Sequence, residues 1–336
     1  EIWVAAGTYY GDGTSTNAFR MVEGVDVYGG FSGTETELEQ RDVETNVTIL
    51  DGQGTQRVLL QDKSYTESTA TVWDGFTIQN GGGIYNGAGA YLCEYGSLKN
   101  CDIKDNGREF RSSSNVYGGG VYVNGGILES CKIHGNLLKN SNSNYLYGAG
   151  VAMTNGIITD CEIYDNEVYN TYSYSYTICG GVYVKNNSST KKARIENCYV
   201  HDNISHGISG GMYLDGYNSS NYVEVVNSRI ENNASEQNGG GLYLSNYVTL
   251  VGCNISNNTS KYNGAGIYAS NYVNVINCNV VNNHINTTSG SYNGAGIDGS
   301  SYANIYNCVI WGNKKADVSD NVYFSGNTNV VVSHSA

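Results

Sequence analysis

Hydrophobic and polar positions alternate along most of this chain in short runs that recur at a similar spacing. The barest copy, residues 264–283, reads GAGIYASNYVNVINCNVVNN. It contains a Gly/Ala tract, an apolar-Tyr-apolar triplet, an alternating strand, an Asn-Cys step and a closing Asn. A period in this range predicts a repeat architecture. Eight copies, 25 to 37 residues apart, close at Asn106, Asn136, Asn166, Asn203, Asn233, Asn258, Asn283 and Asn313.

Within each copy the apolar residues have the period of two that is typical of strands. Ile or Val stands two residues after the Cys position in every copy, and Leu, Ile or Val stands three residues before it. A further strand is expected after each Gly tract. Three short strands leave no room for a helix of average length. The pattern therefore predicts an all-β fold, a right-handed single-stranded parallel β-helix of roughly 11–12 coils, with equivalent positions stacked about 4.8 Å apart.

Three repeated polar or glycine columns predict how each coil turns. The step before the Cys is usually Asn, which tolerates left-handed backbone at a bend. The closing Asn occurs in all eight copies, and stacked amides of this kind form hydrogen bonds along a ladder. One Gly of each tract is also invariant, for which close backbone packing is the simplest cause.

The chain is expected to form one continuous domain. Residues 86–313 hold the eight copies, residues 1–85 form less regular N-terminal coils, and residues 314–336 form the last coil. We expect further chain or a cap beyond both ends. Insertions at one point of a solenoid emerge on one edge and often form its binding face. Strand signals in the N-terminal coils fall at 2–5, 25–28, 47–50, 57–60 and 72–78, and insertions at 107–117, 137–147, 167–179 and 284–293.

Composition narrows the classes of partner. The formal net charge of -13 disfavours nucleic acid, whose binding depends on clustered Lys and Arg. No run approaches the length of about 18 apolar residues that a membrane helix needs. The 44 Gly, the low charged fraction of 15% and the absence of Pro suit a thin core and continuous ladders.

Seven of the nine Cys lie in one inward column, where buried thiols act as small hydrophobes. Disulfides between neighbouring coils stay open as an alternative, because their Cα atoms would lie within bonding range. No Cys or His spacing indicates zinc. Cys93 and Cys179 lie outside the column.

Several segments carry a resemblance to known proteins. WVAAGTYY (3–10), VYGGFSGTET (27–36), TILDGQG (48–54) and DGFTIQN (74–80) resemble the opening of right-handed parallel β-helix proteins secreted by bacteria. The later copies, such as residues 118–136, are similar to polymorphic outer-membrane protein repeats, which pair GGA(I/L/V) with FxxN. This chain has Ile or Val where that family has Phe. The resemblance implies an extracellular or outer cell-surface setting in bacteria, often adhesive.

The insertions are rich in Tyr, Ser, Asn and Gly, a mixture that supplies rigid aromatic anchors and adaptable hydrogen bonds. They predict a surface that binds glycan or protein. Two Tyr columns in the repeats have two interpretations: an aromatic strip for a ligand, or residues of high strand propensity that stack along a ladder. The predicted ligand-binding residues are Tyr117, Tyr145, Tyr147, Tyr169, Tyr172, Tyr174, Tyr176, Arg108 and Arg111. The columns are Tyr91, Tyr122, Tyr183, Tyr213, Tyr243, Tyr268 and Tyr222, Tyr247, Tyr272, Tyr302.

Catalysis by sugar hydrolysis would need two carboxylates at a controlled separation. The acidic residues near the Asn-Cys step and before the closing Asn are interpreted as a solvated face, and no catalytic residue, metal ligand or cofactor is assigned. A calcium ion held by stacked Asp and Asn oxygens stays open. The residues concerned are Asp102, Asp105, Glu129, Asp160, Glu162, Asp165, Glu196 and Asp202.

The leading hypothesis is a non-catalytic, secreted or surface-anchored β-helix that binds glycan or protein partners in the manner of an adhesin. One alternative is a polysaccharide lyase or glycoside hydrolase that uses carboxylates on the 102–202 face. A second alternative is a structural stalk or filament segment.

Overall fold

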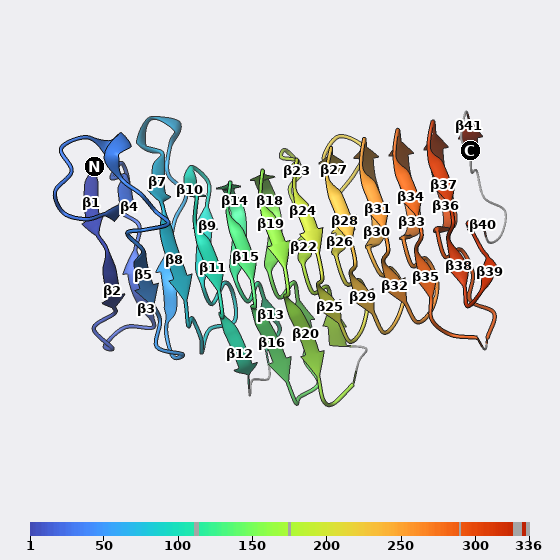
Figure 1. Cartoon of the computed structure of the whole chain (residues 1–336), viewed down its shortest axis with the longest axis horizontal. Coiled ribbons are helices and arrows are strands. Elements are labelled where there is room, and N and C mark those ends of the chain that lie inside the picture. Colours follow the sequence, from blue (N-terminus) through green and yellow to red (C-terminus); the bar gives the residue numbers. More distant parts are fainter. Residues whose placement is uncertain (111–113, 174–175, 289, 325–330, 334–336) are drawn as a thin grey trace.

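The chain winds into a parallel β-helix whose coils follow one another along the long axis of the molecule, with the two termini at opposite ends (Figure 1). The computed structural model describes residues 1–336 except 111–113, 174–175, 289, 325–330 and 334–336. Two short 3-10 turns, Leu38–Gln40 (η1) and Glu67–Thr69 (η2), interrupt the strands near the N-terminus. The part of the chain described contains no helix long and apolar enough to cross a membrane.

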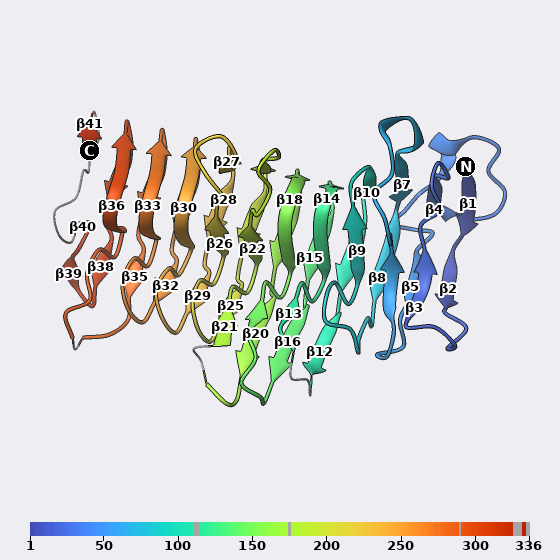
Figure 2. The same ribbon diagram turned by 180° about the vertical axis from the view of Figure 1, so that it is seen from behind.

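The strands form three long sheets and one short one, which can be followed from both sides of the molecule (Figures 1 and 2). The first sheet contains β1 Ile2–Ala5, β3 Asn17–Arg20, β4 Val27–Phe31, β6 Arg57–Leu60, β7 Thr71–Asp74, β9 Ala90–Cys93, β10 Gly96–Lys99, β14 Val121–Glu129, β18 Val151–Thr159, β22 Val182–Lys185, β23 Ala193–Glu196, β26 Met212–Asp215, β27 Val223–Val226, β30 Leu242–Val251, β33 Ile267–Ile276, β36 Ile297–Tyr306, β40 Val322–Phe324 and β41 Val331–Ser333.

The second sheet contains β2 Gly7–Tyr10, β5 Thr48–Asp51, β8 Phe76–Gln79, β11 Asp102–Lys104, β15 Lys132–His134, β19 Glu162–Tyr164, β24 Tyr199–His201, β28 Arg229–Glu231, β31 Asn254–Ser256, β34 Asn279–Val281 and β37 Val309–Trp311. The third contains β12 Gly107–Phe110, β16 Leu137–Asn140, β20 Glu167–Asn170, β25 Ile204–Ser205, β29 Ala234–Ser235, β32 Thr259–Ser260, β35 His284–Ile285, β38 Lys314–Lys315 and β39 Val318–Ser319. The short sheet contains β13 Val116–Tyr117, β17 Leu146–Tyr147 and β21 Thr177–Ile178.

The strand register confirms that equivalent positions of successive copies stack. In the second sheet, for example, Ile133 pairs with Ile103 on one side and with Ile163 on the other, all three fully buried. One apolar core cluster runs without a break from Met21 to Ile310. The second sheet alone has 11 strands, one per coil, in agreement with the predicted parallel β-helix.

The strand assignment within a coil differs from the prediction in one respect. The strand after the Gly tract and the strand before the Cys belong to one sheet, and in β14, β18, β30, β33 and β36 they fuse into one long strand. The third sheet is instead built from the residues after the closing Asn, which the sequence pattern treated as a link. These strands are only two residues long in most coils, too short to show a period.

The closing Asn residues form a buried ladder of side-chain amides. Asn166 Nδ2 donates to Oδ1 of Asn203 (2.9 Å) and to the carbonyl oxygen of Ile133 (2.9 Å), and its Oδ1 accepts from Nδ2 (2.9 Å) and the backbone N–H (3.2 Å) of Asn136. Every amide is therefore satisfied by the coils on either side. The same amide-to-amide bond links Asn106, Asn136, Asn166, Asn203, Asn233, Asn258, Asn283, Asn313 and Asn321.

The invariant Gly column is explained by this ladder. A Cβ on Gly120 would lie 2.6 Å from the carbonyl oxygen of Gly150 and 3.0 Å from Nδ2 of Asn136, so a side chain has no room. The step residues before the Cys adopt the left-handed backbone conformation that the sequence predicted. Their φ angles lie between 48° and 66° at Asn100, Ser130, Asp160, Asn197, Asn227, Gly252, Asn277 and Asn307.

All nine Cys are free and buried. Burial raises the pKa of the Cys101 thiol well above its usual value, so this thiol stays protonated in the interior. The disulfide alternative is therefore not realised in this structure, and the column packs as small hydrophobes.

Three of the insertions form a protrusion from the body of the β-helix, visible at the lower edge of Figure 1. We call the described residues within 107–117, 137–147 and 167–179 the protrusion. The sequence pattern treated them as loops, whereas the structure pairs them as strands of the third and the short sheet. A separate small core stabilises them, made of Val116, Leu138, Leu146, Ala149 and Val168.

The ladder predicts a large loss of stability when one amide is removed. Asn166→Ala removes the side-chain hydrogen bonds that Asn166 forms with the carbonyl of Ile133 and with the amides of Asn136 and Asn203, and should lower the free energy of unfolding by about 3 kcal/mol or more. Asn279→Ala, at an exposed position of β34, should change it by less than about 0.5 kcal/mol. Thermal and urea denaturation measure both, and similar effects of the two substitutions would contradict the ladder's role.

Candidate ligand-binding groove

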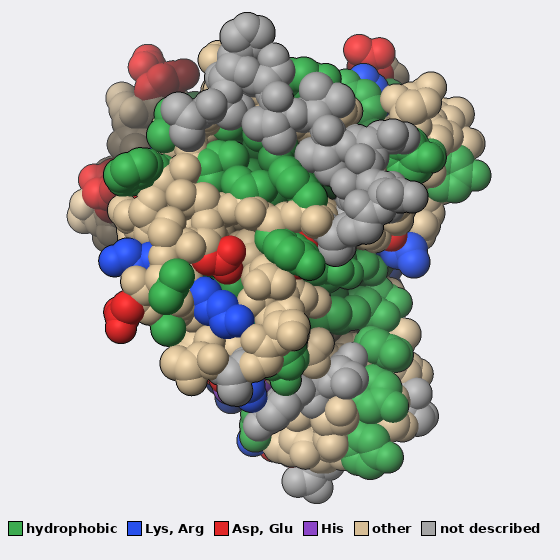
Figure 3. Space-filling view, turned by 90° about the vertical axis from the view of Figure 1, so that its right-hand side faces the viewer, with side chains coloured by type: hydrophobic (Ala, Val, Ile, Leu, Met, Phe, Trp, Pro, Cys, Tyr) green, Lys and Arg blue, Asp and Glu red, His purple; other side chains and the backbone are tan. Residues whose placement is uncertain are grey.

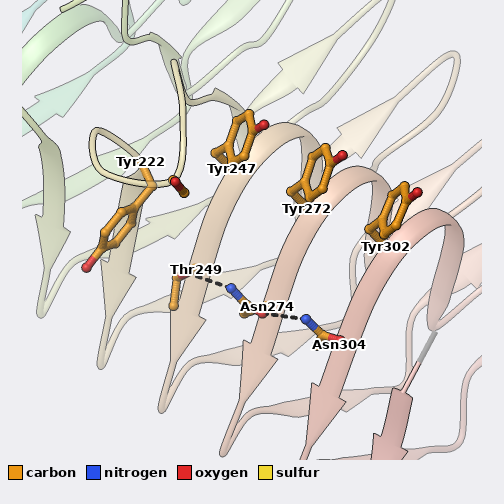
Figure 4. Close-up of a pocket in the computed structure, with 8 residues that line it drawn as sticks. Tyr222, Tyr247, Thr249, Tyr272, Asn274, Tyr302 and Asn304 are labelled. Carbon is orange, nitrogen blue, oxygen red and sulfur yellow. Dashed lines mark hydrogen bonds between the residues drawn. The ribbon is translucent and has the colours of Figure 1, made fainter. Parts of the chain in front are cut away.

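Three Tyr side chains, Tyr247, Tyr272 and Tyr302, stand in a row along one edge of the first sheet, and Tyr222 occupies the equivalent position of the preceding coil, six residues before the Cys position (Figure 4). Tyr247 stacks on Tyr272 with ring centroids 4.8 Å apart and planes 2° from parallel, and Tyr272 stacks on Tyr302 at 4.8 Å and 8°. Tyr272 and Tyr302 are 45% and 43% exposed. We call Tyr222, Tyr247, Tyr272 and Tyr302 the tyrosine shelf.

The shelf overlooks a hollow of about 410 Å³ whose floor is uncharged on three successive coils. Nδ2 of Asn274 donates to Oγ1 of Thr249 (3.3 Å), and Nδ2 of Asn304 donates to Oδ1 of Asn274 (2.9 Å), so the floor repeats the coil spacing (Figure 4). Because Tyr272 is covered on both faces by its neighbours, it offers its ring edge and hydroxyl to the hollow. The arrangement can form hydrogen bonds to a polar, uncharged ligand that also has apolar edges.

The backbone beneath the shelf is not in a strand conformation. The φ angles of Tyr247, Tyr272 and Tyr302 are +47°, +53° and +55°, in the left-handed region, where a residue with a Cβ costs about 1–2 kcal/mol. Strand propensity therefore cannot be the reason for Tyr at these bends, where Gly or Asn would be less strained. Strain of this kind clusters at sites of function.

The structure brings together five of the predicted ligand-binding residues. Tyr117 stacks on Tyr147 at 4.5 Å and 6°, and Tyr145 lies 5.8 Å from Tyr147. The contacts continue outward from Tyr145 to Tyr176 at 4.9 Å and from Tyr176 to Tyr172 at 5.9 Å. Tyr145 and Tyr172 are 38% and 65% exposed, so the outer end of this cluster faces solvent.

The inner end of the cluster serves packing. The outward Tyr column of the first sheet is interrupted at Ala152, which is fully buried. The rings of Tyr117 and Tyr147 pack at Ala152. The ring of Tyr117 lies 6.2 Å from that of Tyr122, and the ring of Tyr147 lies 4.7 Å from that of Tyr183; Tyr122 and Tyr183 are the column residues on either side of Ala152. The protrusion is thereby anchored to the body of the β-helix. The small residue that makes the space was not linked to the insertions from sequence.

The remaining predicted residues lie elsewhere. Arg108 reaches back to the preceding coil, where Nη2 donates to Oδ1 of Asn80 at 2.7 Å. Tyr169 packs against His206 at 4.6 Å, on strands β20 and the turn after β25. Arg111 and Tyr174 lie outside the described residues.

Several carboxylates on the 102–202 face form ion pairs or hydrogen bonds with basic or histidine side chains. Oδ1 of Asp102 lies 2.8 Å from Nε2 of His134 and its Oδ2 lies 2.9 Å from Nζ of Lys104. Burial raises the pKa of Asp102, but these two hydrogen bonds outweigh it and hold the pKa below its usual value. Oε1 of Glu162 lies 3.2 Å from Nε2 of His201. The ion pair keeps Asp102 ionised, whereas glycoside hydrolysis also needs a protonated acid.

The acidic residues just before the closing Asn have a backbone explanation. Asp105, Asp165 and Asp202 have φ angles of +54°, +51° and +53°, and Asn or Gly takes the same position in the other copies. These are the residue types that tolerate left-handed backbone. Among the described residues, no group of three or more His, Cys, Asp or Glu is placed to hold a metal ion, and the calcium site stays a prediction.

No protein-family model matches the chain, and no curated protein sequence matches it. Among solved structures, the chain is similar to the Dettilon tailspike protein, with 12% sequence identity, 92% of this chain covered and a TM-score of 0.41. It spans 61% of the length of that chain. A likeness at this level carries no argument, so the fold rests on the strand pairing itself. The resemblance to polymorphic outer-membrane protein repeats stays a prediction.

The pKa of Asp298 is raised, in contrast to the lowered pKa of Asp102. Asp298 replaces Tyr in the outward column after Tyr268, pairs with Tyr323 in β40 and is only 6% exposed. Burial, together with the charge of Asp320, raises its pKa to about 7. Its position below the surface keeps it from contact with a large ligand, so we treat it as a determinant of stability.

This shift predicts a pH dependence of folding. The folded protein keeps the Asp298 proton up to about pH 7, whereas the unfolded chain releases it near the ordinary value of 3.8. The stabilisation is complete below about pH 4 and is lost as the pH rises towards 7. Asp298→Asn should therefore be more stable than the parent at pH 8, by at least about 1 kcal/mol, with little difference at pH 4. Melting curves at both pH values, with exposed Asp317→Asn as control, measure the difference; a pH-independent effect would contradict it.

Proposed function

We propose that this protein is a glycan-binding β-helix of an extracellular or outer cell-surface setting, and that an extended sugar chain lies along the tyrosine shelf. The observation that carries the proposal is the row of three left-handed Tyr residues above an uncharged amide and hydroxyl floor. Strained positions persist only when the surrounding structure holds them in place.

The repetition of the shelf favours a ligand that is itself a repeating chain. Each of the three coils that carry Tyr247, Tyr272 and Tyr302 offers one Tyr hydroxyl and one Thr or Asn side chain, and the same groups recur about 4.8 Å further along in the next coil. Sugar hydroxyls match such uncharged donors and acceptors, whereas the net charge of -13 opposes nucleic acid. Viewed from the C-terminal end, charged side chains are few and scattered among uncharged polar and hydrophobic groups (Figure 3).

The exposed end of the Tyr cluster on the protrusion is a second candidate contact. Tyr145 and Tyr172 are exposed and both contact the ring of Tyr176, an arrangement that suits either a protein partner or a second segment of glycan. This cluster differs from the shelf because its rings do not repeat at the same position in successive coils and do not lie above a repeated row of polar side chains.

Removal of the shelf should abolish glycan binding without unfolding the protein. We expect the double variant Tyr272→Ala/Tyr302→Ala to lose at least about tenfold in affinity for whichever polysaccharide the parent binds on an array of immobilised bacterial and plant polysaccharides. Tyr10→Ala, at an exposed position of β2 at the other end of the molecule, is the matched control. An unchanged array profile of the double variant, or no retention of the parent by any polysaccharide, would refute the proposal.

Binding and stability should respond differently at Tyr272. Tyr272→Asn relieves left-handed strain but removes ring stacking, and these terms of about 1 kcal/mol each oppose one another. We expect the free energy of unfolding to change by less than about 1 kcal/mol while affinity for the polysaccharide falls. A loss of stability of several kcal/mol, measured by urea denaturation, would show that Tyr272 serves the fold instead.

A further inference from the structure

A second hollow, of about 270 Å³, continues the same edge of the first sheet towards the N-terminus. It begins where the tyrosine shelf ends: Lys192 lines this hollow, Tyr222 lines the other, and Nζ of Lys192 lies 3.1 Å from Oη of Tyr222. The ammonium group also lies 4.3 Å from the centre of that ring. Tyr95, in the same column as the shelf, closes the far end. A ligand chain on the shelf would reach this hollow without a turn.

The floor of the second hollow is apolar in two successive coils only. Ile127 and Ile157 pair side by side in β14 and β18, and Ile157 is 39% exposed. The overlying bend position carries Gly125 and Asn155 instead of Tyr, which leaves the two Ile side chains accessible. In the other copies the Ile position is polar, at Ser97, Arg194, Glu224, Thr249, Asn274 and Asn304.

Two polar groups at this hollow, Lys192 and Asn155, are incompletely paired within the described part of the chain. Lys191 forms an ion pair with Glu94 and closes one side, whereas no carboxylate among the described residues pairs with Lys192. Asn155 is 92% buried, and its Oδ1 receives no hydrogen bond from any described residue. The hollow therefore combines a cation without a carboxylate partner among the described residues, a buried acceptor without a donor and an apolar floor. A buried acceptor without a donor is energetically costly.

We propose that the second hollow binds an N-acylated acidic sugar unit of the groove's ligand. Its carboxylate would pair with Lys192, its acyl methyl group would lie on Ile127 and Ile157, and its amide N–H would be directed towards Asn155. This proposal rests on the proposed function, because it takes the ligand to be a sugar chain that continues from the shelf. It adds that the sugar chain is anionic, although the protein itself carries a net negative charge.

The test compares 3′-sialyllactose with lactose by isothermal titration calorimetry, since the two differ by one N-acylated acidic sugar. The parent protein should bind sialyllactose at least about tenfold more tightly, and Lys192→Gln should remove that preference. Lys192→Arg, which keeps the charge, should retain it. Lys185→Gln, at an exposed lysine of the same coil, is the matched control. Ile157→Asn should weaken sialyllactose binding and leave lactose unchanged.

The outcomes separate this proposal from the proposed function. A parent protein that binds both sugars equally, or a Lys192→Gln variant that keeps the preference, overturns the proposal for the second hollow. The shelf proposal still stands in that case if Tyr272→Ala/Tyr302→Ala loses polysaccharide binding. Conversely, a sialyllactose preference that depends on Lys192, with polysaccharide binding indifferent to the shelf, supports the second hollow and overturns the shelf.

Discussion

The buried Asn ladder is the interaction on which the remainder of the structure depends. Each closing Asn bonds to the amide of the next coil and to a backbone carbonyl of the preceding one, so a coil cannot shift along its neighbour without breaking several buried bonds. The same amides leave no room for a side chain at Gly120 and its equivalents. Register is thereby determined at one corner of every coil, and the apolar strands then follow with their inward sets in contact.

A fixed register lets the surface change without any change in the core. The bend position six residues before the Cys is Tyr in five copies and Gly, Asn or Lys in three. The residues two places later, which form the floor, also vary: they are amides or hydroxyls in four copies, isoleucines in two, and Arg194 and Glu224 in the remaining two. Because the inward residues of these strands are buried throughout, variation at the bend alters the groove and leaves the packing intact.

Part of the predicted binding surface has a structural role that only the folded chain shows. Tyr117 and Tyr147 were chosen for their place in Tyr-rich insertions, and they do join Tyr145, Tyr172 and Tyr176 in one cluster. Their rings, however, fill the gap that Ala152 leaves in a neighbouring column. The Tyr residues of the shelf, in contrast, could be recognised in the sequence as a repeated column. The sequence did not show whether Tyr occurs there to contact a ligand or because Tyr has a high strand propensity. The φ angles of Tyr247, Tyr272 and Tyr302 lie outside the strand region, so strand propensity does not explain Tyr at these positions.

The amino-acid sequence by itself determined the parallel β-helix, the stacked Asn, Gly and Cys columns and the left-handed steps. These features follow from local periodicity, from residues that tolerate special backbone angles and from repetition of both, all of which can be read within one copy. The tertiary structure alone decided that the insertions pair as strands, that Tyr117 and Tyr147 pack at Ala152, and that Lys192, Asn155 and Ile157 share one hollow. Such contacts join residues from different copies at positions where the copies differ. Their geometry depends on how the coils stack and bend in three dimensions, which no single repeat encodes.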